Sequence, residues 1–253
     1  MRTNKVLGNW KMNLTYNDAM TLAQEMTEAL ANTTVNCEVG FFVPSPYIND
    51  IVTSKIGAYP ETKIGFQNAN VGTYYTGVCM PDAVANCGVA YNLVGQAECR
   101  NYLGITSEVC SQQIRLFSSL NIPSVYCVGE NLEERETGQT NSVLNTQLTE
   151  GLSGLSAEEM ANTTIAYEPV WTVGTGKTCL PTDVEEACAY IRSLISEKYG
   201  QEMGENTSIL YGGSLKPSNA PELFGMPNID GGLVGGASLK VADFMGIVEA
   251  YNR

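Results

Sequence analysis

The sequence contains no histidine, and it has only 14 basic residues against 27 acidic ones, for a formal net charge of −13. A chain this acidic repels phosphate backbones and anionic headgroups, so we expect neither nucleic acid nor a membrane as a partner. The chain also lacks Cys-x-x-Cys pairs, which together with the missing histidine excludes the usual zinc sites, and we expect no metal. Its longest apolar run is far too short to cross a bilayer.

The N-terminus lacks the apolar stretch of a secretory signal, because residues 1–5 lead directly into a strand-like segment. Eight cysteines are present, and without such a signal we expect reduced thiols and a cytoplasmic location. Disulfides are the alternative that an even number of cysteines leaves open. With 43% hydrophobic residues, 253 residues can build a large core, and we expect a single domain over residues 1–253.

Strand-like and helix-like segments alternate along the whole chain. A capping box between Thr182 and Glu185 is expected to open one of the helices. Eight strands that alternate with helices indicate parallel βα units, which close into a (β/α)8 barrel, the α/β fold class that we predict. An open doubly wound sheet is the alternative that length alone does not exclude. Strands are expected at 5–10, 38–43, 63–68, 91–94, 124–128, 163–167, 208–211 and 231–234, and helices at 18–30, 107–120, 141–152, 182–199 and 241–251.

Polar and glycine-rich residues follow several of the expected strands. In a (β/α)8 barrel the carboxyl ends of the strands form the face that carries active sites. Packing alone does not explain such a convergence, so we expect the active site there. The segments are Asn9-Trp10-Lys11, Gly95-Gln96-Ala97-Glu98, Glu168, Tyr211-Gly212-Gly213-Ser214 and Gly235-Gly236-Ala237-Ser238.

Glu168 ends a buried strand-like segment and is followed at once by a short apolar flap. Desolvation under a closed flap raises the basicity of a carboxylate, so Glu168 is the candidate general base. The alternative is a structural glutamate paired with an arginine. Proline and a glycine pair are suitable hinges, and Trp171 a suitable latch. The expected flap consists of Pro169, Val170, Trp171, Thr172, Val173, Gly174, Thr175, Gly176 and Lys177.

A phosphate group is the anion that the glycine-rich strand ends favour, because glycine lets backbone N–H groups approach a ligand closely. Lys11 can neutralise a phosphate or an enediolate oxygen, with Glu98 as the ion-pair partner that orients it. A solvated surface lysine is the plainer alternative for Lys11. Residues 174–178 do not form a P-loop, because Trp171 stands where that motif requires glycine.

Seven segments, taken in order, resemble signatures of the triosephosphate isomerase family over the whole chain. The resemblance implies a TIM barrel that interconverts dihydroxyacetone phosphate and glyceraldehyde 3-phosphate in glycolysis and gluconeogenesis, without a cofactor and as a homodimer. The segments are Asn9-Trp10-Lys11-Met12-Asn13, Gln67-Asn68, Tyr126-Cys127-Val128-Gly129-Glu130, Glu133-Glu134-Arg135-Glu136, and residues 166–178, 211–214 and 233–239. The implied roles are electrophile for Lys11, base for Glu168, and substrate or phosphate contacts for Asn9, Lys11, Gly174, Ser214, Gly235 and Gly236.

The chain departs from the family after the fourth strand, where a Gly-His-Ser-Glu-Arg-Arg run is replaced by residues 95–100. Gln96 occupies the position of the catalytic histidine. A glutamine amide can donate a hydrogen bond to a substrate oxygen but cannot readily give up and retake a proton, so we expect a slowed isomerase. Charges that the family places at Val78, Cys99 and Ile105 are lost together, and the loop at 69–75 is shorter.

The sequence is also compatible with two other functions. One is an isomerase of another small sugar phosphate, which differs in the substrate length that it accepts. The other is a catalytically silent phosphate-binding barrel, which would bind phosphate ligands without turnover. The presence of Glu168, Lys11 and the flap favours an enzyme.

Overall fold

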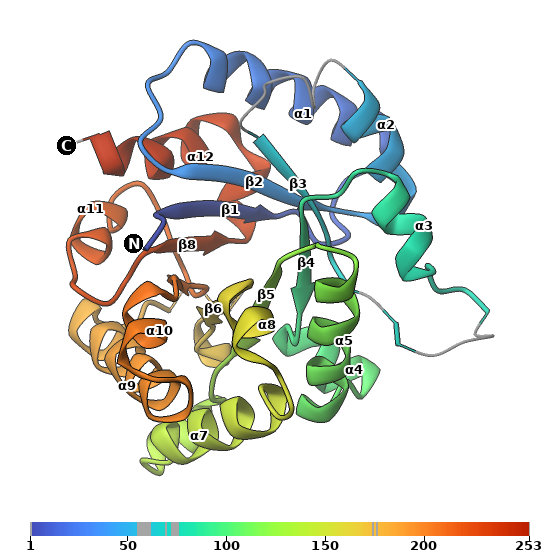
Figure 1. Ribbon diagram of the computed structural model, residues 1–253. Coiled ribbons are helices and arrows are strands. Elements are labelled where there is room, and N and C mark those ends of the chain that lie inside the picture. Colours follow the sequence, from blue (N-terminus) through green and yellow to red (C-terminus); the bar gives the residue numbers. More distant parts are fainter. Residues whose placement is uncertain are drawn as a thin grey trace.

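The computed structural model describes residues 2–54, 62–68, 70–71, 76–173, 175 and 177–252. Within these residues, eight parallel strands form a closed barrel in their order along the chain, with helices packed around it (Figure 1). The predicted (β/α)8 TIM barrel is therefore confirmed. The strands are β1 (Lys5–Asn9), β2 (Glu38–Val43), β3 (Thr62–Phe66), β4 (Tyr91–Val94), β5 (Ser124–Val128), β6 (Thr163–Tyr167), β7 (Ile209–Tyr211) and β8 (Gly231–Val234).

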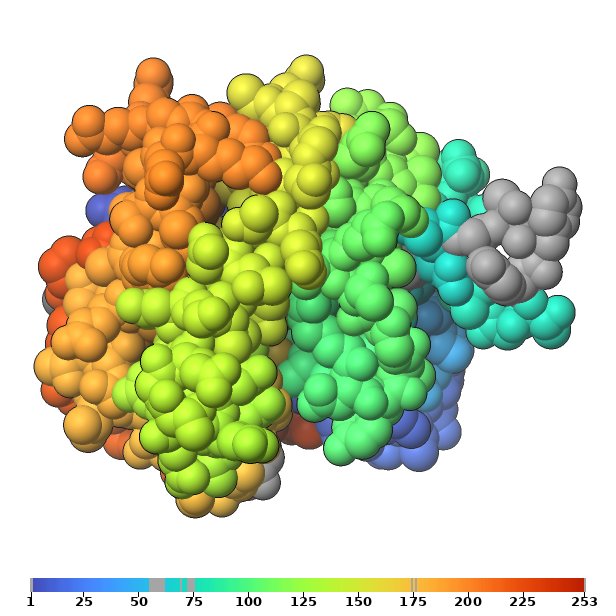
Figure 2. Space-filling model, turned by 90° about the horizontal axis from the view of Figure 1, so that it is seen from below, coloured from blue at the N-terminus to red at the C-terminus, as the bar shows by residue number. Residues whose placement is uncertain are grey.

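The helices form the outer layer, and Figure 2 shows α5 in green beside α7 in lime on one face of it. Among the helices of the described ranges, none combines the length and apolar character needed to span a bilayer. The α-helices are α1 (Tyr16–Ala31), α2 (Ile48–Thr53), α3 (Pro81–Asn86), α4 (Ala97–Leu103), α5 (Ser107–Ser119), α6 (Leu132–Glu136), α7 (Thr140–Gly151), α8 (Ala157–Ala161), α9 (Pro181–Tyr199), α10 (Gln201–Asn206), α11 (Ala220–Phe224) and α12 (Val241–Val248). Short 3-10 helices are η1 (Ser45–Tyr47), η2 (Val170–Thr172), η3 (Gly236–Leu239) and η4 (Glu249–Asn252).

The expected strand boundaries agree with the structure at β2, β4, β5, β6 and β8. The first strand is one residue shorter than expected and ends at Asn9, which leaves Trp10 and Lys11 in the loop above it. The third strand begins earlier and ends at Phe66, and the seventh begins at Ile209. The last expected helix, 241–251, is divided into α12 and η4.

The expected capping box at the start of α9 is wrong. The helix begins at Pro181, and no side chain caps its N-terminus. Glu185 instead accepts hydrogen bonds from the backbone N–H of Asn228 at 3.0 Å and from its Nδ2 at 2.7 Å. The carboxylate of Glu185, which the local sequence pattern assigned to the helix cap, thus binds Asn228 from a distant segment instead.

Two apolar layers hold the barrel together, one inside it and one between the strands and the helices. Successive side chains of a strand point to opposite faces, and both faces are covered, so the strands are almost wholly buried. The outer layer includes Trp10, Phe117 and Phe244. The inner layer consists of Leu7, Phe42, Tyr91, Leu93, Val125, Cys127, Ala166, Leu210 and Leu233.

A half-buried cluster of three polar side chains closes the amino-terminal end of the barrel. Lys5 Nζ donates to the Tyr91 hydroxyl at 2.7 Å, and that hydroxyl donates to Glu38 Oε1 at 2.5 Å. Lys5 also forms an ion pair with Glu38 at 3.4 Å. The interior is therefore filled at this end, and the cavity described below lies at the carboxyl end.

Arg192 joins α9 to the last two strands. Its guanidinium donates to the carbonyl oxygens of Gly204 at 2.6 Å and Thr207 at 2.8 Å, and to Asp230 Oδ2 at 2.9 Å. Asp230 Oδ2 also accepts from the backbone N–H of Ile209 at 2.8 Å. Both charged side chains are buried, with 6% and 7% of their surface exposed, so their pairing offsets the cost of burying the two charges. Asp230 has a second cation nearby, since Arg2 lies 3.4 Å from its Oδ1.

We predict that Arg192→Met lowers the free energy of unfolding by about 3–5 kcal/mol, because it removes the buried partner of Asp230 and leaves that carboxylate only the more exposed Arg2 as a cation, at 3.4 Å. The matched control is Arg115→Met. The side chain of Arg115 is 56% exposed and lies 3.9 Å from Glu159, so its loss should cost less than about 1 kcal/mol. Urea unfolding at one protein concentration measures both, and equal losses would contradict the account.

Candidate active site

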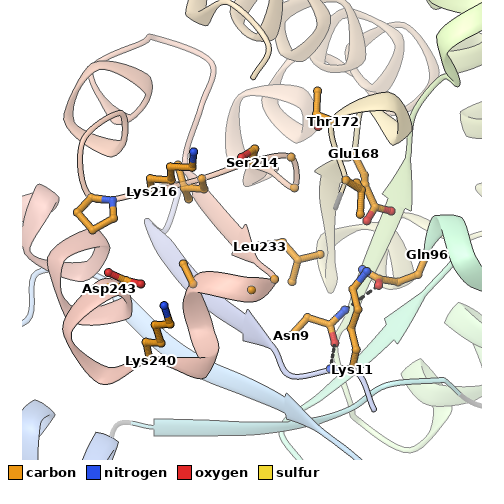
Figure 3. A pocket seen from close by; sticks show the side chains of 18 of the residues that line it. Asn9, Lys11, Gln96, Glu168, Thr172, Ser214, Lys216, Leu233, Lys240 and Asp243 are labelled. Atoms are coloured by element: carbon orange, nitrogen blue, oxygen red, sulfur yellow. Dashed lines mark hydrogen bonds between the residues drawn. The ribbon is translucent and has the colours of Figure 1, made fainter. Parts of the chain in front are cut away.

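A cavity of about 720 Å³ opens at the carboxyl ends of the strands. Figure 3 shows Asn9, Lys11, Gln96 and Glu168 gathered on one side of it and Ser214 on another. Gly235 and Gly236 also line it, as do Thr172 and Val173 of the flap. The expected catalytic residues thus lie around one cavity, whereas Glu98 lines a neighbouring cavity and is joined to this site through Lys11. Gly174 and Gly176 lie outside the described residues.

Lys11 has a backbone conformation that only glycine adopts readily, with φ at 50°. Such a conformation costs a non-glycine residue about 1–3 kcal/mol and persists where surrounding contacts enforce it. Here the backbone N–H of Lys11 donates to Asn9 Oδ1 at 3.0 Å, and its carbonyl accepts from Gln67 Nε2 at 2.9 Å. Nζ forms the expected ion pair with Glu98 Oε1 at 2.8 Å. These contacts hold the ammonium group over the cavity.

Gln96 follows β4 and immediately precedes α4. Its side chain is buried, and its Oε1 accepts from Asn9 Nδ2 at 2.7 Å. Its Nε2 lies 3.4 Å from the Sγ of Cys127, to which it donates. The amide therefore has a partner on each side, and it still lines the cavity.

Glu168 follows β6, and its carboxylate is buried. Its Oε2 accepts a hydrogen bond from the backbone N–H of Ala97 at 3.0 Å. Burial, with a smaller contribution from the charge of Glu98, raises the pKa of Glu168 to about 7. The Ala97 hydrogen bond and the positive charges of Lys11 and Arg100 act in the opposite direction. A carboxylate with this pKa can take up and return a proton near neutral pH.

Two glycines allow the loops around these residues to approach closely. Gly95 has φ at 74°, and a side chain there would collide with Arg100, whose Nε donates to the Gly95 carbonyl at 2.8 Å. A side chain at Gly129 would collide with the backbone of Glu168. Arg100 also donates to the carbonyl of Cys127 at 3.2 Å, so it ties the loop of Gln96 to β5.

The described part of the flap is fastened to Glu130, a residue to which the sequence analysis gave no role. Trp171 Nε1 donates to Glu130 Oε1 at 3.1 Å, and the Tyr167 hydroxyl donates to the same oxygen at 3.0 Å. Burial raises the pKa of Glu130, and these two donors oppose the rise. The hydroxyl of Thr172 donates to the Pro169 carbonyl at 2.8 Å, which stabilises the 3-10 turn η2.

Open space surrounds the glycine-lined end of the cavity. A side chain at Gly235 or Gly236 would meet no atom within 4 Å, so both glycines face the cavity. Ser214 lies on the loop after β7, where its carbonyl accepts from Asn219 Nδ2 at 3.0 Å. Beyond them, Lys216 and Lys240 line the outer part of the cavity (Figure 3). Neither lysine is among the expected site residues, because neither occurs in a motif recognised in the sequence.

A second cavity of about 640 Å³ lies on the other side of Asn9, Lys11 and Gln96, which also line this cavity. Its rim is apolar and exposed: Met12 is 92% exposed, Tyr102 84% and Leu103 64%. Cys99 also lines it, and burial raises the pKa of this thiol to about 11.

Ile105 and Val78, the other two positions at which the resemblance implies a lost charge, differ in their surroundings. Ile105 packs against the core, whereas Val78 is exposed. Within the described ranges, no three acidic or cysteine side chains come together as metal ligands would.

Comparison with known proteins agrees with this geometry. The family model of triosephosphate isomerase matches residues 4–251. Proteins named triosephosphate isomerase from Bacteroides fragilis and Phocaeicola vulgatus are each 45% identical to this chain, over 100% and 99% of it and 100% of each relative. A triosephosphate isomerase from Chloroherpeton thalassium is 40% identical over 99% of both chains. Because the model and the relatives match almost the full length, this chain belongs to the triosephosphate isomerase family.

Proposed function

We propose that the protein interconverts dihydroxyacetone phosphate and glyceraldehyde 3-phosphate through an enediolate, without a cofactor. The observation that carries the proposal is the buried carboxylate of Glu168, whose pKa is raised to about 7 in the cavity that Lys11 also lines. The names of the full-length relatives support the same substrate. The glycine-lined end at Ser214, Gly235 and Gly236 is suited to the phosphate group.

In the proposed reaction, Glu168 takes a proton from the carbon beside the carbonyl group. The electrons of the broken C–H bond form a carbon–carbon double bond, and the π electrons of the carbonyl group move onto its oxygen. The ammonium of Lys11 and an N–H of Gln96 stabilise the negative charge that develops on this oxygen. Glu168, now a carboxylic acid, returns the proton to the neighbouring carbon. One group thus acts as base and then as acid, which its pKa near neutrality permits.

Gln96 limits the rate in this scheme. A proton must also pass between the two substrate oxygens, and a neutral amide can donate a hydrogen bond to either oxygen without releasing its own proton. That transfer then falls to Glu168 or to the enediolate oxygens themselves. We therefore propose a working but slowed isomerase.

The flap at residues 169–177 is proposed to exclude water while the enediolate exists, because water would compete for the reactive intermediate and weaken its electrostatic stabilisation. The contact between Trp171 and Glu130 supports this role. It fastens the flap at its tip, and a contact of this kind can exchange as the flap moves.

We also propose a homodimer in the cytoplasm. The exposed apolar side chains of Met12, Tyr102 and Leu103 surround the second cavity, which an identical subunit would cover. All eight cysteines are free thiols, which suits a reducing compartment.

We predict that Gln96→His raises kcat by about 10²–10⁴, the usual contribution of a positioned proton donor and acceptor. The KM should change less, because the groups assigned to the phosphate are untouched. A coupled assay that starts from glyceraldehyde 3-phosphate measures both constants.

Glu168→Gln is the control for that assay, and it should abolish turnover with either residue at position 96. If Gln96→His does not raise kcat, the explanation for slow turnover is wrong. If the folded wild-type protein binds inorganic phosphate but shows no turnover above Glu168→Gln, the protein is a silent phosphate-binding barrel. Turnover of a longer sugar phosphate alone would identify another isomerase.

The pH dependence of kcat/KM should show the ionisation of Glu168. The base is lost as the pH falls through about 7, so kcat/KM should decline below that value. Glu98→Gln removes a negative charge that raises the pKa of Glu168, and it should move this decline to lower pH. The control Glu202→Gln makes the same charge change on α10, outside the cavity, and should leave the profile unchanged. A decline unmoved by Glu98→Gln would belong to the substrate phosphate.

We predict that Leu103→Glu shifts the protein from dimer to monomer in analytical ultracentrifugation, because it places a charge on the apolar rim. The matched control is Leu180→Glu, since Leu180 is 65% exposed, like Leu103 at 64%, and lies outside the second cavity. A monomeric wild-type protein, or a dimer in both variants, would contradict the proposed interface.

A further inference from the structure

The amide groups of Asn9 and Gln96 belong to a chain of hydrogen bonds that has only one possible direction. It starts at the backbone N–H of Lys11, which lies 3.0 Å from Asn9 Oδ1. A backbone N–H can only donate, so the Asn9 atom that faces it must be the oxygen. The amide nitrogen of Asn9 is thereby placed on the opposite side, toward Gln96.

The orientation of the Asn9 amide in turn fixes the orientation of the Gln96 amide through the next hydrogen bond. Asn9 Nδ2 donates to Gln96 Oε1 at 2.7 Å, and both side chains are nearly inaccessible, at 4% and 3% exposed. A reversed Gln96 would set two amide NH2 groups against each other in a buried place, where unpaired donors are costly. Gln96 Nε2 is therefore turned away from Asn9.

Cys127 receives the last bond of the chain. Its Sγ lies 3.4 Å from Gln96 Nε2, and the side chain is fully buried inside the barrel. Burial raises the pKa of the Cys127 thiol well above its usual value, so the group stays neutral, and its sulfur can accept weakly. An amide nitrogen carries two hydrogens. One is directed to Cys127, and the other is left for the cavity that Gln96 lines.

This polarity decides what Gln96 can do in the reaction. The two ends of an amide have nearly the same shape, so only the neighbours determine which end faces a given direction. A nitrogen toward the substrate stabilises the developing oxyanion, whereas a carbonyl oxygen there would repel it. We propose that Asn9 and Cys127 are positioning residues that hold Gln96 with an N–H directed at the substrate oxygen. This inference rests on the proposed isomerase function.

The first test is Cys127→Ala. This variant removes the sulfur that accepts from Gln96 Nε2, and it should lower kcat by about five- to tenfold, the change in rate that corresponds to one hydrogen bond. The Kd of inorganic phosphate should stay unchanged, because Cys127 is not assigned to the phosphate. Cys127→Ser retains a hydroxyl acceptor and should keep kcat within about twofold of the wild type. The control is Cys188→Ala, which removes an equally buried thiol from α9, outside the cavity, and should leave kcat unchanged.

A double-variant cycle shows whether Cys127 acts through Gln96. If it does, adding Cys127→Ala to Gln96→Ala should not lower kcat further, because no amide is left to position. Asn9→Asp should also lower kcat, since a carboxylate cannot donate to Oε1 and would attract Nε2 away from the substrate. That effect should be smaller in the Gln96→Ala background.

Side-chain amide NMR of glutamine-labelled protein tests the polarity without turnover. Gln96→Ala assigns the pair of Nε2 hydrogens, and Cys127→Ala should shift that pair and speed its exchange with solvent, whereas Cys188→Ala should not. The inference is overturned if the Gln96 resonances are unmoved by Cys127→Ala, or if Cys127→Ala slows the Gln96→Ala enzyme as much as the wild type. Absence of wild-type turnover with the expected NMR shifts would reject the proposed function and leave the assigned polarity intact.

Discussion

The parallel register of the closed barrel is the constraint on which the site depends. It aligns the carboxyl ends of the strands, with Val128 of β5 opposite Tyr167 of β6, and Tyr167 opposite Tyr211 of β7. The residue that follows each strand therefore reaches the same cavity. Glu168 is held there by its backbone N–H, which donates to the Val128 carbonyl at 2.8 Å. Because β6 ends at this depth, the carboxylate of Glu168 is buried and desolvated, and this desolvation raises its pKa.

An amide at position 96 places other demands on the neighbouring residues than an imidazole would. An imidazole can exchange a proton, whereas an amide is useful only when its nitrogen points toward the charge that develops. Asn9 and Cys127 provide the surroundings that distinguish the two ends of Gln96. Ala97 contributes only its backbone N–H to Glu168. A site with glutamine at position 96 has one group fewer that can exchange protons than a site with histidine there. In our proposal Glu168 therefore performs the proton transfers.

The sequence predicted the barrel because its strands are short apolar runs separated by helical periodicity, a pattern that survives in almost any tertiary context. It also located Glu168 and the Lys11–Glu98 ion pair, because residues after successive strands must meet. It failed at Glu185, whose carboxylate binds Asn228 from a distant segment. It gave no role to Cys127 or Glu130, because each acts only through a side chain that the fold brings to it.

The central claim is that Glu168 transfers a carbon-bound proton through an enediolate. Conversion of dihydroxyacetone phosphate in D₂O, followed by NMR of the product, tests it most directly. A carboxylic acid exchanges its proton with solvent, so we predict that glyceraldehyde 3-phosphate carries deuterium on the carbon that Glu168 protonates, and that Glu168→Gln forms no product. Product that contains no solvent deuterium, or forms equally fast in Glu168→Gln, would contradict the claim.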